Sequence, residues 1–296
     1  MNDGAGVGGK RIVMTGATNG IGLAAAEALG GRGARLTIIA RSQAKANLAL
    51  QRIEAAGGKD VDIILADFAS QAQVRRAAAE ILARHSTLDA LVNNAGGYFT
   101  TRRFTEDGIE MTWAVNHLAG FLLTNLLLER LKENAHARVV ITASDAHVRA
   151  HVPFDDMDGT AAYAERAMAG PGFIRYGQTK LANVLFSAEL ARRLSGTGVT
   201  ANCFHPGLVA TGITRDLSGM AGIAIRVVNA FARRPSKGAE TLVWLVDSPE
   251  VAGVSGGYFL DQRRATPSAV AQDVDMARRL WEVSDAQTRA PAEVGR

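Results

Sequence analysis

The sequence predicts a single α/β domain built on a doubly wound parallel sheet. Apolar runs of strand length alternate with segments of helical pattern, and this alternation is typical of a parallel sheet with helices on both faces. Each strand-like run ends in small or polar residues, where such sheets bind their ligands. We find no linker that divides the 296 residues. We therefore expect one domain over residues 10–284, a flexible N-terminal tail over residues 1–9 and a C-terminal tail over residues 285–296.

The composition excludes several classes of protein. Hydrophobic residues make up 47% and charged residues 21% of the chain, as in ordinary soluble globular proteins. The net charge is only +4 and the basic residues are scattered, so we expect no nucleic-acid partner. Cys203 is the only cysteine, which rules out an internal disulfide and a cysteine-based metal cluster, and we expect no metal site. The most apolar run, residues 121–131, is far shorter than the roughly 20 residues of a membrane span. We expect a cytoplasmic protein with no membrane span.

A glycine-rich turn directly follows the first strand. The strand is predicted at residues 11–15, residues 15–22 read TGATNGIG, and an alanine-rich helical pattern continues to Leu29. Glycines permit a sharp turn and let a pyrophosphate approach the amides at the positive end of a helix. A glycine loop alone is equally compatible with a simple turn, but its place after the first strand favours a dinucleotide site.

The second strand, residues 36–40, predicts the choice of cofactor. Arg41 and Ser42 follow it, where the chain should reach the adenosine ribose. An NAD site usually places a carboxylate there, and none occurs between Leu36 and Lys45. Arg41 can instead pair with a 2′-phosphate, with Lys45 as a candidate second cation. The alternative is a solvated arginine that opens the next helix. We predict NADP(H) as the cofactor.

The remaining elements continue the alternation. Strands are predicted at residues 61–66, 88–92 and 138–143, and helices at residues 42–56, 70–85 and 106–134. The third strand closes on Asp67 and Phe68, and Ser70 is suited to cap the helix that follows. The fourth closes on Asn93-Asn94-Ala95-Gly96-Gly97, where small residues permit close approach of a ligand.

A later helix carries Tyr176 and Lys180, whose spacing places both side chains on one face. A phenol is a poor acid or base at neutral pH, because its pKa lies near 10. An ammonium about 4 Å away in a partly desolvated site supplies roughly the 4 kcal/mol that lowers this pKa to about 7. Tyr176 could then exchange a proton with a substrate oxygen. The motif alone is weak, since it arises by chance in roughly one such chain in twelve.

Together, in this order, the motifs resemble those of the short-chain dehydrogenase/reductase family. They are Thr15 to Gly22, Asn93 to Gly96, Asn116, Ser144 and Tyr176 to Lys180. Residues 115–121, 180–186 and 257–259 look most like the branch that contains retinol dehydrogenases and protochlorophyllide reductases. The resemblance covers roughly residues 10–284. It implies a Rossmann-type sheet, a nicotinamide cofactor and a catalytic tetrad of Asn116, Ser144, Tyr176 and Lys180.

The resemblance also implies a role for each residue. Ser144 would hydrogen-bond the substrate oxygen, Tyr176 would act as acid or base, and Lys180 would hold the nicotinamide ribose and lower the tyrosine pKa. Asn116 would position a proton-relay water, Asp67 would contact the adenine, and residues 205–211 would wrap the carboxamide end of the cofactor. The predicted cofactor contacts are Gly16, Thr18, Asn19, Gly20, Ile21, Gly22, Arg41, Ser42, Asp67, Phe68, Asn93, Ala95, Gly96, Tyr176, Lys180, Pro206, Gly207, Val209 and Thr211. His147 and His151 follow Ser144 closely, but loop histidines are more often solvated than catalytic, so neither is given a role.

Two stretches depart from the simplest family pattern. Residues 145–175 form a long link between serine and tyrosine. Its candidate pocket residues are Phe154, Met157, Tyr163, Met168 and Phe173. Residues 212–234 are rich in apolar side chains and are predicted to form a substrate lid, with surface packing as the alternative.

We therefore predict an NADP-dependent oxidoreductase that transfers a hydride between nicotinamide C4 and a carbonyl or alcohol carbon of a small hydrophobic substrate, with Tyr176 as acid or base. The alternatives are reduction of an activated C=C bond and a non-catalytic NADP-binding regulatory protein. Helices over residues 116–131 and 181–194 are apolar on more than one face. The family commonly pairs these helices, so we expect a homodimer or homotetramer. The competing interpretation is that these helices are shortened or covered, since residues 212–234 could shield the same surface.

Overall fold

The computed structural model describes residues 6–165, 170, 172–207 and 233–289. Within these ranges the strands form one eight-stranded sheet of order β3-β2-β1-β4-β5-β6-β7-β8. Neighbouring strands are parallel except β7 and β8, which are antiparallel. The order reverses between β1 and β4, as in a doubly wound sheet, so the predicted fold class is confirmed. The predicted lid, residues 212–234, lies almost entirely outside the described residues.

The elements lie close to their predicted positions. The strands are β1 (Arg11–Thr15), β2 (Arg35–Ala40), β3 (Val61–Leu65), β4 (Ala90–Asn93), β5 (Arg138–Thr142), β6 (Thr200–His205), β7 (Tyr258–Leu260) and β8 (Arg263–Ala265). The helices are α1 (Gly20–Gly31), α2 (Gln43–Ala55), α3 (Gln71–Arg84), α4 (Met111–Trp113), α5 (Ala119–Lys132), α6 (Thr160–Ala164), α7 (Phe173–Arg193), α9 (Pro235–Asp247) and α10 (Val274–Thr288). The helix predicted over residues 106–134 begins only at Met111, and a π-helical turn, Ala114–Leu118, joins α4 to α5.

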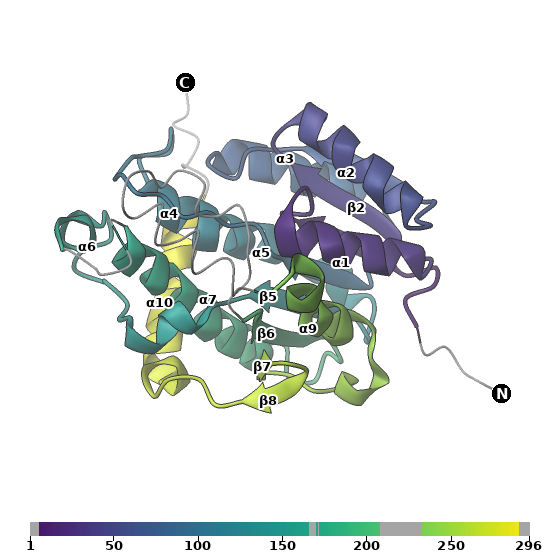
Figure 1. Cartoon of the computed structure of the whole chain (residues 1–296). Coiled ribbons are helices and arrows are strands. Elements are labelled where there is room, and N and C mark those ends of the chain that lie inside the picture. Colours follow the sequence, from purple (N-terminus) through teal and green to yellow (C-terminus); the bar gives the residue numbers. More distant parts are fainter. Residues whose placement is uncertain (1–5, 166–169, 171, 208–232, 290–296) are drawn as a thin grey trace, which may run out of the picture.

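Two helical layers cover the sheet (Figure 1). Helices α1, α2 and α9 pack on one face, and α3, α5 and α7 pack on the other. Side chains of a strand alternate between faces. In β1, Ile12 and Met14 accordingly join the core under α1 and α9, whereas Val13 joins the core under α3, α5 and α7.

Helix α10 covers the outer surface of α7 and also contacts α5. The Trp281 ring centroid lies 4.9 Å from that of Phe121 in α5 and 5.8 Å from that of Phe186 in α7. The Arg193 guanidinium lies over the Trp281 ring, 4.2 Å from its centroid. Among the described residues, α10 therefore covers part of these apolar faces, as the competing interpretation expects of another segment. Pairing with a second subunit stays a prediction.

The last turns of α10 are anchored to the π-helical turn by a buried histidine. His117 Nε2 lies 2.8 Å from Ser284 Oγ, and His117 Nδ1 lies 3.2 Å from Asn183 Oδ1. Burial lowers the pKa of His117 to about 4, so the ring is neutral and accepts one bond while it donates the other. Helix α10 continues past residue 284 to Thr288. Near the other end, Val7 is buried and its carbonyl accepts a hydrogen bond from the Lys10 amide. The domain boundaries stay a prediction.

The stretch Met111–Lys132 has the length and composition of a membrane span, with a mean hydropathy of 1.2. Of its most apolar window, 67% is buried inside the protein, and α5 contributes Phe121, Leu123 and Leu127 to the core. A core helix of a soluble protein has the same composition. The absence of a membrane span remains a prediction.

Candidate active site

The turn between β1 and α1 is built on glycines that the chain's own packing requires. Gly16 has φ of +67°, which favours glycine. A Cβ on Gly16 would lie 2.8 Å from Ala95 Cα, and one on Gly22 would lie 2.2 Å from the Gly16 carbonyl oxygen. The turn is thus pressed against the loop after β4. Asn19, at the N-cap of α1, makes no side-chain capping bond, which leaves the amides of the first turn to an anion such as a pyrophosphate.

Residues between the ends of β1, β4 and β5 hold this corner together. Thr15 Oγ1 accepts hydrogen bonds from the amides of Asn94 and Ala95, both at 2.9 Å. Asn94 Nδ2 donates to the Gly16 carbonyl at 3.2 Å, and Thr142 Oγ1 donates to Asn94 Oδ1 at 3.1 Å. Sequence reasoning missed Thr15 and Asn94 as site residues, although both lie in motifs that it had identified.

Asn93 has an unused acceptor beneath the site. Its Nδ2 donates to Thr124 Oγ1 at 2.8 Å, but its buried Oδ1 has no hydrogen-bond partner among the described residues. Asn93 lines a cavity of about 10 Å³, together with Thr15, Phe68, Asn116 and Asn183 among others. This volume is about that of one water molecule. A polar ligand atom or a water can satisfy the amide oxygen.

The residues predicted to bind the adenosine end follow β2 and β3. Arg41 is exposed directly after β2, and its guanidinium forms no ion pair within the described residues. Ser42 caps α2 through a long bond of 3.5 Å from the Lys45 amide. After β3, Asp67 Oδ1 accepts from the Ala69 amide at 3.0 Å. Both Arg41 and Asp67 stand at the carboxyl edge of the sheet, where the fold places a dinucleotide.

The four predicted catalytic residues come together beyond the ends of β4 and β5. Ser144 follows β5 and donates to Asp145 Oδ1 at 3.2 Å. Tyr176, in the first turns of α7, lies near enough to Ser144 for the serine hydroxyl to lower the pKa of the tyrosine. Lys180 Nζ lies 5.4 Å from the centroid of the Tyr176 ring and donates to the Thr142 carbonyl at 3.2 Å. Gly96 completes the group, since a Cβ there would lie 3.6 Å from Lys180 Nζ and 3.3 Å from Asn116 Oδ1.

Asn116 lies in the π-helical turn, a feature that is frequent at functional sites. Its Oδ1 accepts from the Gly97 amide at 2.7 Å, and its Nδ2 donates to the Gly97 carbonyl at 2.9 Å and to Thr179 Oγ1 at 3.2 Å. The Asn116 carbonyl accepts from Asn183 Nδ2 at 3.0 Å. The side chain is therefore occupied in joining the loop after β4 to α7, and no contact tests its expected part in holding a water.

Burial shifts the pKa values of Tyr176 and Lys180 in opposite directions. Burial raises the pKa of Tyr176 to about 12, the hydrogen bond with Ser144 lowers it, and the nearby charge of Asp145 raises it. Burial also lowers the pKa of Lys180 to about 8. The ammonium lies over the ring and donates to the Thr142 carbonyl. Its expected lowering of the tyrosine pKa stays a prediction. In this geometry Tyr176 is a protonated acid at neutral pH.

Two aromatic side chains stand beside the tyrosine. The centroid of the Tyr176 ring lies 6.0 Å from that of Tyr98 and 6.3 Å from that of Phe173. Burial raises the pKa of Tyr98 to about 12. Phe173 was a predicted pocket residue and is 36% exposed. Tyr98 was missed, although it directly follows the Asn-Asn-Ala-Gly-Gly turn.

Three of the other pocket candidates in residues 145–175 are partly buried and make contacts within the protein. Phe154 and Met157 pack against the core, and Arg279 lies over the Phe154 ring at 4.0 Å. Tyr163 directs its hydroxyl into a buried polar cluster, at 2.7 Å from Thr112 Oγ1. Met168 lies outside the described residues. Phe154, Met157 and Tyr163 are each partly buried, and their place in a substrate pocket stays a prediction.

His147 is also a structural residue, so the prediction that it is solvated is wrong. Its Nδ1 lies 2.6 Å from the Ser144 carbonyl, and its Nε2 accepts from the Ser268 amide at 3.2 Å. Burial lowers its pKa, and the neutral ring braces the backbone of Ser144. His151 is exposed as expected.

The segment expected at the carboxamide end of the cofactor is described only in part. Pro206 and Gly207 follow β6, and Gly207 has φ of +79°. Val209 and Thr211 lie outside the described residues. Within the described ranges, no group of three His, Cys, Asp or Glu side chains could hold a metal ion.

A glycine turn after the first strand of a doubly wound sheet, with Ser144, Tyr176 and Lys180 beyond the fifth, defines a dinucleotide-dependent oxidoreductase. The family model for short chain dehydrogenases matches residues 10–155. Mouse retinol dehydrogenase 14 is 39% identical over 291 residues, which cover 94% of this chain and 85% of that protein. DnrU from Streptomyces sp. (strain C5), provisionally named a daunorubicin C-13 ketoreductase, is 38% identical over 281 residues, 95% of this chain and 93% of that protein.

Solved structures agree with the sequence relatives. A short chain dehydrogenase from Burkholderia cenocepacia in complex with NADP superposes with a TM-score of 0.68 and 27% identity, over 90% of this chain and 99% of that one. The protein belongs to the short-chain dehydrogenase/reductase family, whose members bind a nicotinamide cofactor, and lies in the branch similar to the retinol dehydrogenases.

Proposed function

We propose that the protein is an NADPH-dependent carbonyl reductase in which Tyr176 donates a proton to the substrate oxygen. The observation that supports this most is the place of Tyr176 beside Ser144 and Lys180, with the tyrosine pKa raised to about 12. A phenol that keeps its proton at neutral pH is suited to protonate an oxygen that gains negative charge. Reduction is therefore the direction that this geometry favours.

The chain's own residues fit the proposed cofactor. The uncapped amides of α1 suit the pyrophosphate. Within the part of the chain that the structure describes, Asn93 Oδ1 is a free acceptor beneath the site, and Arg41 is an unpaired cation suited to a 2′-phosphate. The cofactor would supply the hydride at nicotinamide C4. The NADP bound by the relative from B. cenocepacia supports the same choice.

In the proposed reaction the protein orients the substrate oxygen and moves one proton. Ser144 and Tyr176 present two hydroxyls to that oxygen, and Tyr176 gives up the proton at its Oη. Lys180, buried beneath the tyrosine ring, supplies a positive charge where the phenolate forms. Tyr98 and Phe173 provide an aromatic wall beside the reacting oxygen, which favours a hydrophobic carbonyl compound.

Two alternatives have different support. One relative is named for a ketone and another for retinol, so alcohol oxidation by the same residues stays open as the reverse direction. Reduction of an activated C=C bond would use the same tyrosine to protonate carbon. A non-catalytic regulatory protein would not need Ser144 and Tyr176 in contact.

A substrate screen tests the proposal. Purified protein is mixed with NADPH and a panel of hydrophobic ketones, aldehydes and enones, and oxidation of the nicotinamide is followed by its absorbance. Chromatography of the enone products distinguishes an allylic alcohol from a saturated ketone. Turnover of carbonyl compounds that is lost in Tyr176→Phe supports the proposal. Saturated ketone as the sole product would replace it with the C=C alternative, and no turnover of any class would refute it.

A further inference from the structure

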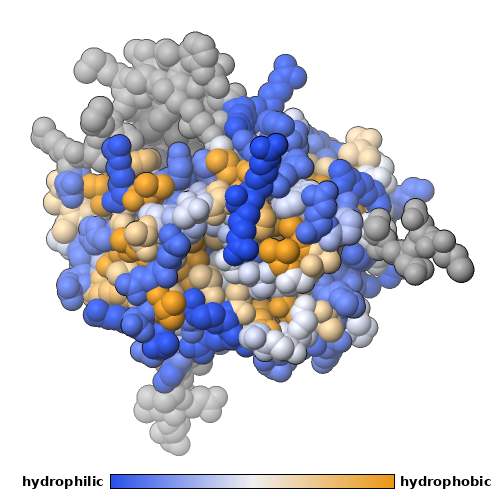
Figure 2. Space-filling view, turned by 90° about the horizontal axis from the view of Figure 1, so that it is seen from below, coloured by the Kyte–Doolittle hydropathy of each residue, from blue (hydrophilic) through white to orange (hydrophobic). Residues whose placement is uncertain are grey.

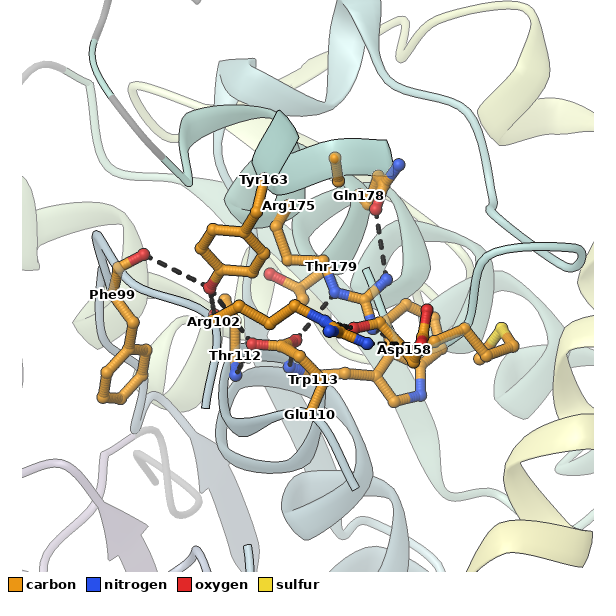
Figure 3. Close-up of polar contacts among 12 residues, drawn as sticks. Phe99, Arg102, Glu110, Thr112, Trp113, Asp158, Tyr163, Arg175, Gln178 and Thr179 are labelled. Carbon is orange, nitrogen blue, oxygen red and sulfur yellow. Dashed lines mark hydrogen bonds and ion pairs between the residues drawn. The ribbon is translucent and has the colours of Figure 1, made fainter. Parts of the chain in front are cut away.

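A buried polar cluster lies directly behind the catalytic tyrosine. Its centre is an ion pair between Arg175 Nε and Glu110 Oε2 at 2.7 Å, and both side chains have an exposed fraction of 0%. Figure 3 shows the pair enclosed by Thr112, Tyr163 and Gln178. We call these five residues the Glu110 cluster. Arg175 precedes Tyr176 in α7, so neighbouring residues of one helix serve the cluster and the active site.

The guanidinium of Arg175 is bonded on all sides. Its Nη1 donates to Gln178 Oε1 at 3.1 Å, its Nη2 donates to the Met157 carbonyl, and its Cζ lies 5.0 Å from the centroid of the Trp113 ring. A planar, forked donor with this many fixed partners has one orientation. The first turn of α7 is therefore locked in rotation.

The carboxylate of Glu110 orders the opposite side. Its Oε1 accepts from the Thr112 amide at 2.8 Å, and its Oε2 accepts from the Trp113 amide at 3.0 Å. These amides begin the helical stretch that carries Asn116 in its π-helical turn. Tyr163 adds a bond from its hydroxyl to Glu110 Oε1 at 3.1 Å, which ties α6 to the same carboxylate.

The cluster thus joins the two elements that carry the catalytic residues. One ion pair connects the start of α7, with Tyr176 and Lys180, to the start of α4 and the π-helical turn, with Asn116. The bond from Asn116 Nδ2 to Thr179 Oγ1 at 3.2 Å crosses the same contact closer to the site. A shift of either element would separate Tyr176 from Asn116.

Burying both charges is costly, and apolar side chains of similar volume are often as stable. What the charges add is direction, since each hydrogen bond fixes an angle as well as a distance. The pair is closed to solvent, so it cannot touch substrate. We propose that Glu110 and Arg175 are positioning residues that set the register of α7 against the π-helical turn. This inference rests on the proposed function, because it assigns the pair a task in that reaction.

The test replaces both charges at once, so that neither is left buried alone. In Glu110→Leu/Arg175→Met we expect a folded protein with a lower melting temperature, because the Thr112 and Trp113 amides lose their capping acceptor. We expect kcat to fall roughly ten- to a hundredfold, the loss associated with a misplacement of up to about 1 Å. The Kd for NADPH, measured by fluorescence, should stay within about threefold, since a threefold change corresponds to well under 1.4 kcal/mol. Arg102→Met, which breaks the exposed ion pair with Asp158 nearby, is the matched control and should change none of these quantities.

A second measurement separates this inference from the proposed function. Hydrogen exchange followed by mass spectrometry needs no turnover, and in the double variant it should be faster over residues 173–180 and 111–118 and unchanged in β1 and α1. If the wild type reduces no carbonyl compound, the proposed function fails while the exchange result still decides whether the pair sets the register. A double variant with wild-type kcat and wild-type exchange would overturn the inference.

A second variant serves if the double variant does not fold. Arg175→Lys keeps the positive charge but loses the planar guanidinium and its several fixed donors. A folded Arg175→Lys with full kcat would also overturn the inference, and a selective loss of kcat would support it.

Discussion

Replacing the catalytic lysine should stabilise the protein while it abolishes activity. Lys180 is almost completely buried, and its pKa falls from 10.5 to about 8. At about 1.36 kcal/mol per pKa unit, holding this charge at pH 7 costs the folded state about 3.4 kcal/mol. Methionine has a similar volume and no charge, but it gives up the charge-assisted bond to the Thr142 carbonyl, worth about 1.5 kcal/mol. Lys180→Met should therefore gain about 2 kcal/mol at neutral pH, or roughly 4–8 °C in melting temperature.

The pH dependence makes the test specific. The pKa of Lys180 is lowered in the folded state. Above the unfolded pKa of 10.5 the amine is neutral in both states, so burial of the lysine costs no charge and this stability is fully present. The stability is lost as pH falls, and the loss is complete below about pH 8, where the buried amine is charged. Relative to the variant, the wild type gains about 1.36 kcal/mol per unit between these values, and the two should be equally stable near roughly pH 9.5. Urea unfolding at pH 7 and pH 9.5 measures both differences.

The control is an exposed lysine. Lys237 pairs with Glu240 on the surface of α9, and Lys237→Met should change stability by less than about 0.5 kcal/mol at either pH. A Lys180→Met variant that is no more stable than wild type at pH 7, or whose gain does not shrink with pH, would refute the reasoning from burial.

Three further predictions follow from the site and the fold. Tyr176→Phe should abolish turnover in single-turnover kinetics while NADPH still binds, because the ring is kept and only the transferable proton is lost; wild-type rates would remove Tyr176 from the mechanism. Arg41→Asp should invert or abolish the preference for NADPH over NADH, since a charge-assisted bond worth about 1.5–3 kcal/mol is replaced by repulsion. The measurement is kcat/KM for both cofactors at fixed ionic strength, and a variant that keeps its full preference for NADPH would show that Arg41 is wrongly assigned. The wild type should sediment as a monomer at micromolar concentration because α10 covers α5 and α7, whereas Trp281→Asp should self-associate or unfold at lower temperature; a stable wild-type dimer through α5 and α7 would contradict the covered face.

What the sequence could predict was local in origin. The strands and the glycine turn follow from apolar periodicity and residue type, and the face shared by Tyr176 and Lys180 follows from helical spacing. The direction of the Lys180 ammonium does not follow from helical spacing, because it bonds the Thr142 carbonyl, which lies 38 residues earlier in the chain.

The Glu110 cluster lay beyond sequence reasoning for the same reason. Glu110 and Arg175 are 65 residues apart, and a lone glutamate and a lone arginine carry no sign that they will be buried together. Tyr163 was predicted to line a pocket because aromatic residues in a long link suit that role. In the structure its hydroxyl donates to the buried Glu110 carboxylate. The covering of α7 by α10 was equally hidden, since an amphipathic pattern shows that a helix has an apolar face and not what that face meets.

The position of α10 has a consequence for how the chain folds as it is made. The helix is the last element of the described chain, yet Trp281 covers Phe121 and Phe186, and Ser284 completes the bonds of His117 next to Asn116. Domains fold from the N-terminus as synthesis proceeds, so the sheet can assemble before this helix leaves the ribosome. During that interval the apolar faces of α5 and α7 stay open to water and to other nascent chains. We therefore expect the apolar faces of α5 and α7 to be most prone to aggregation before α10 packs on them.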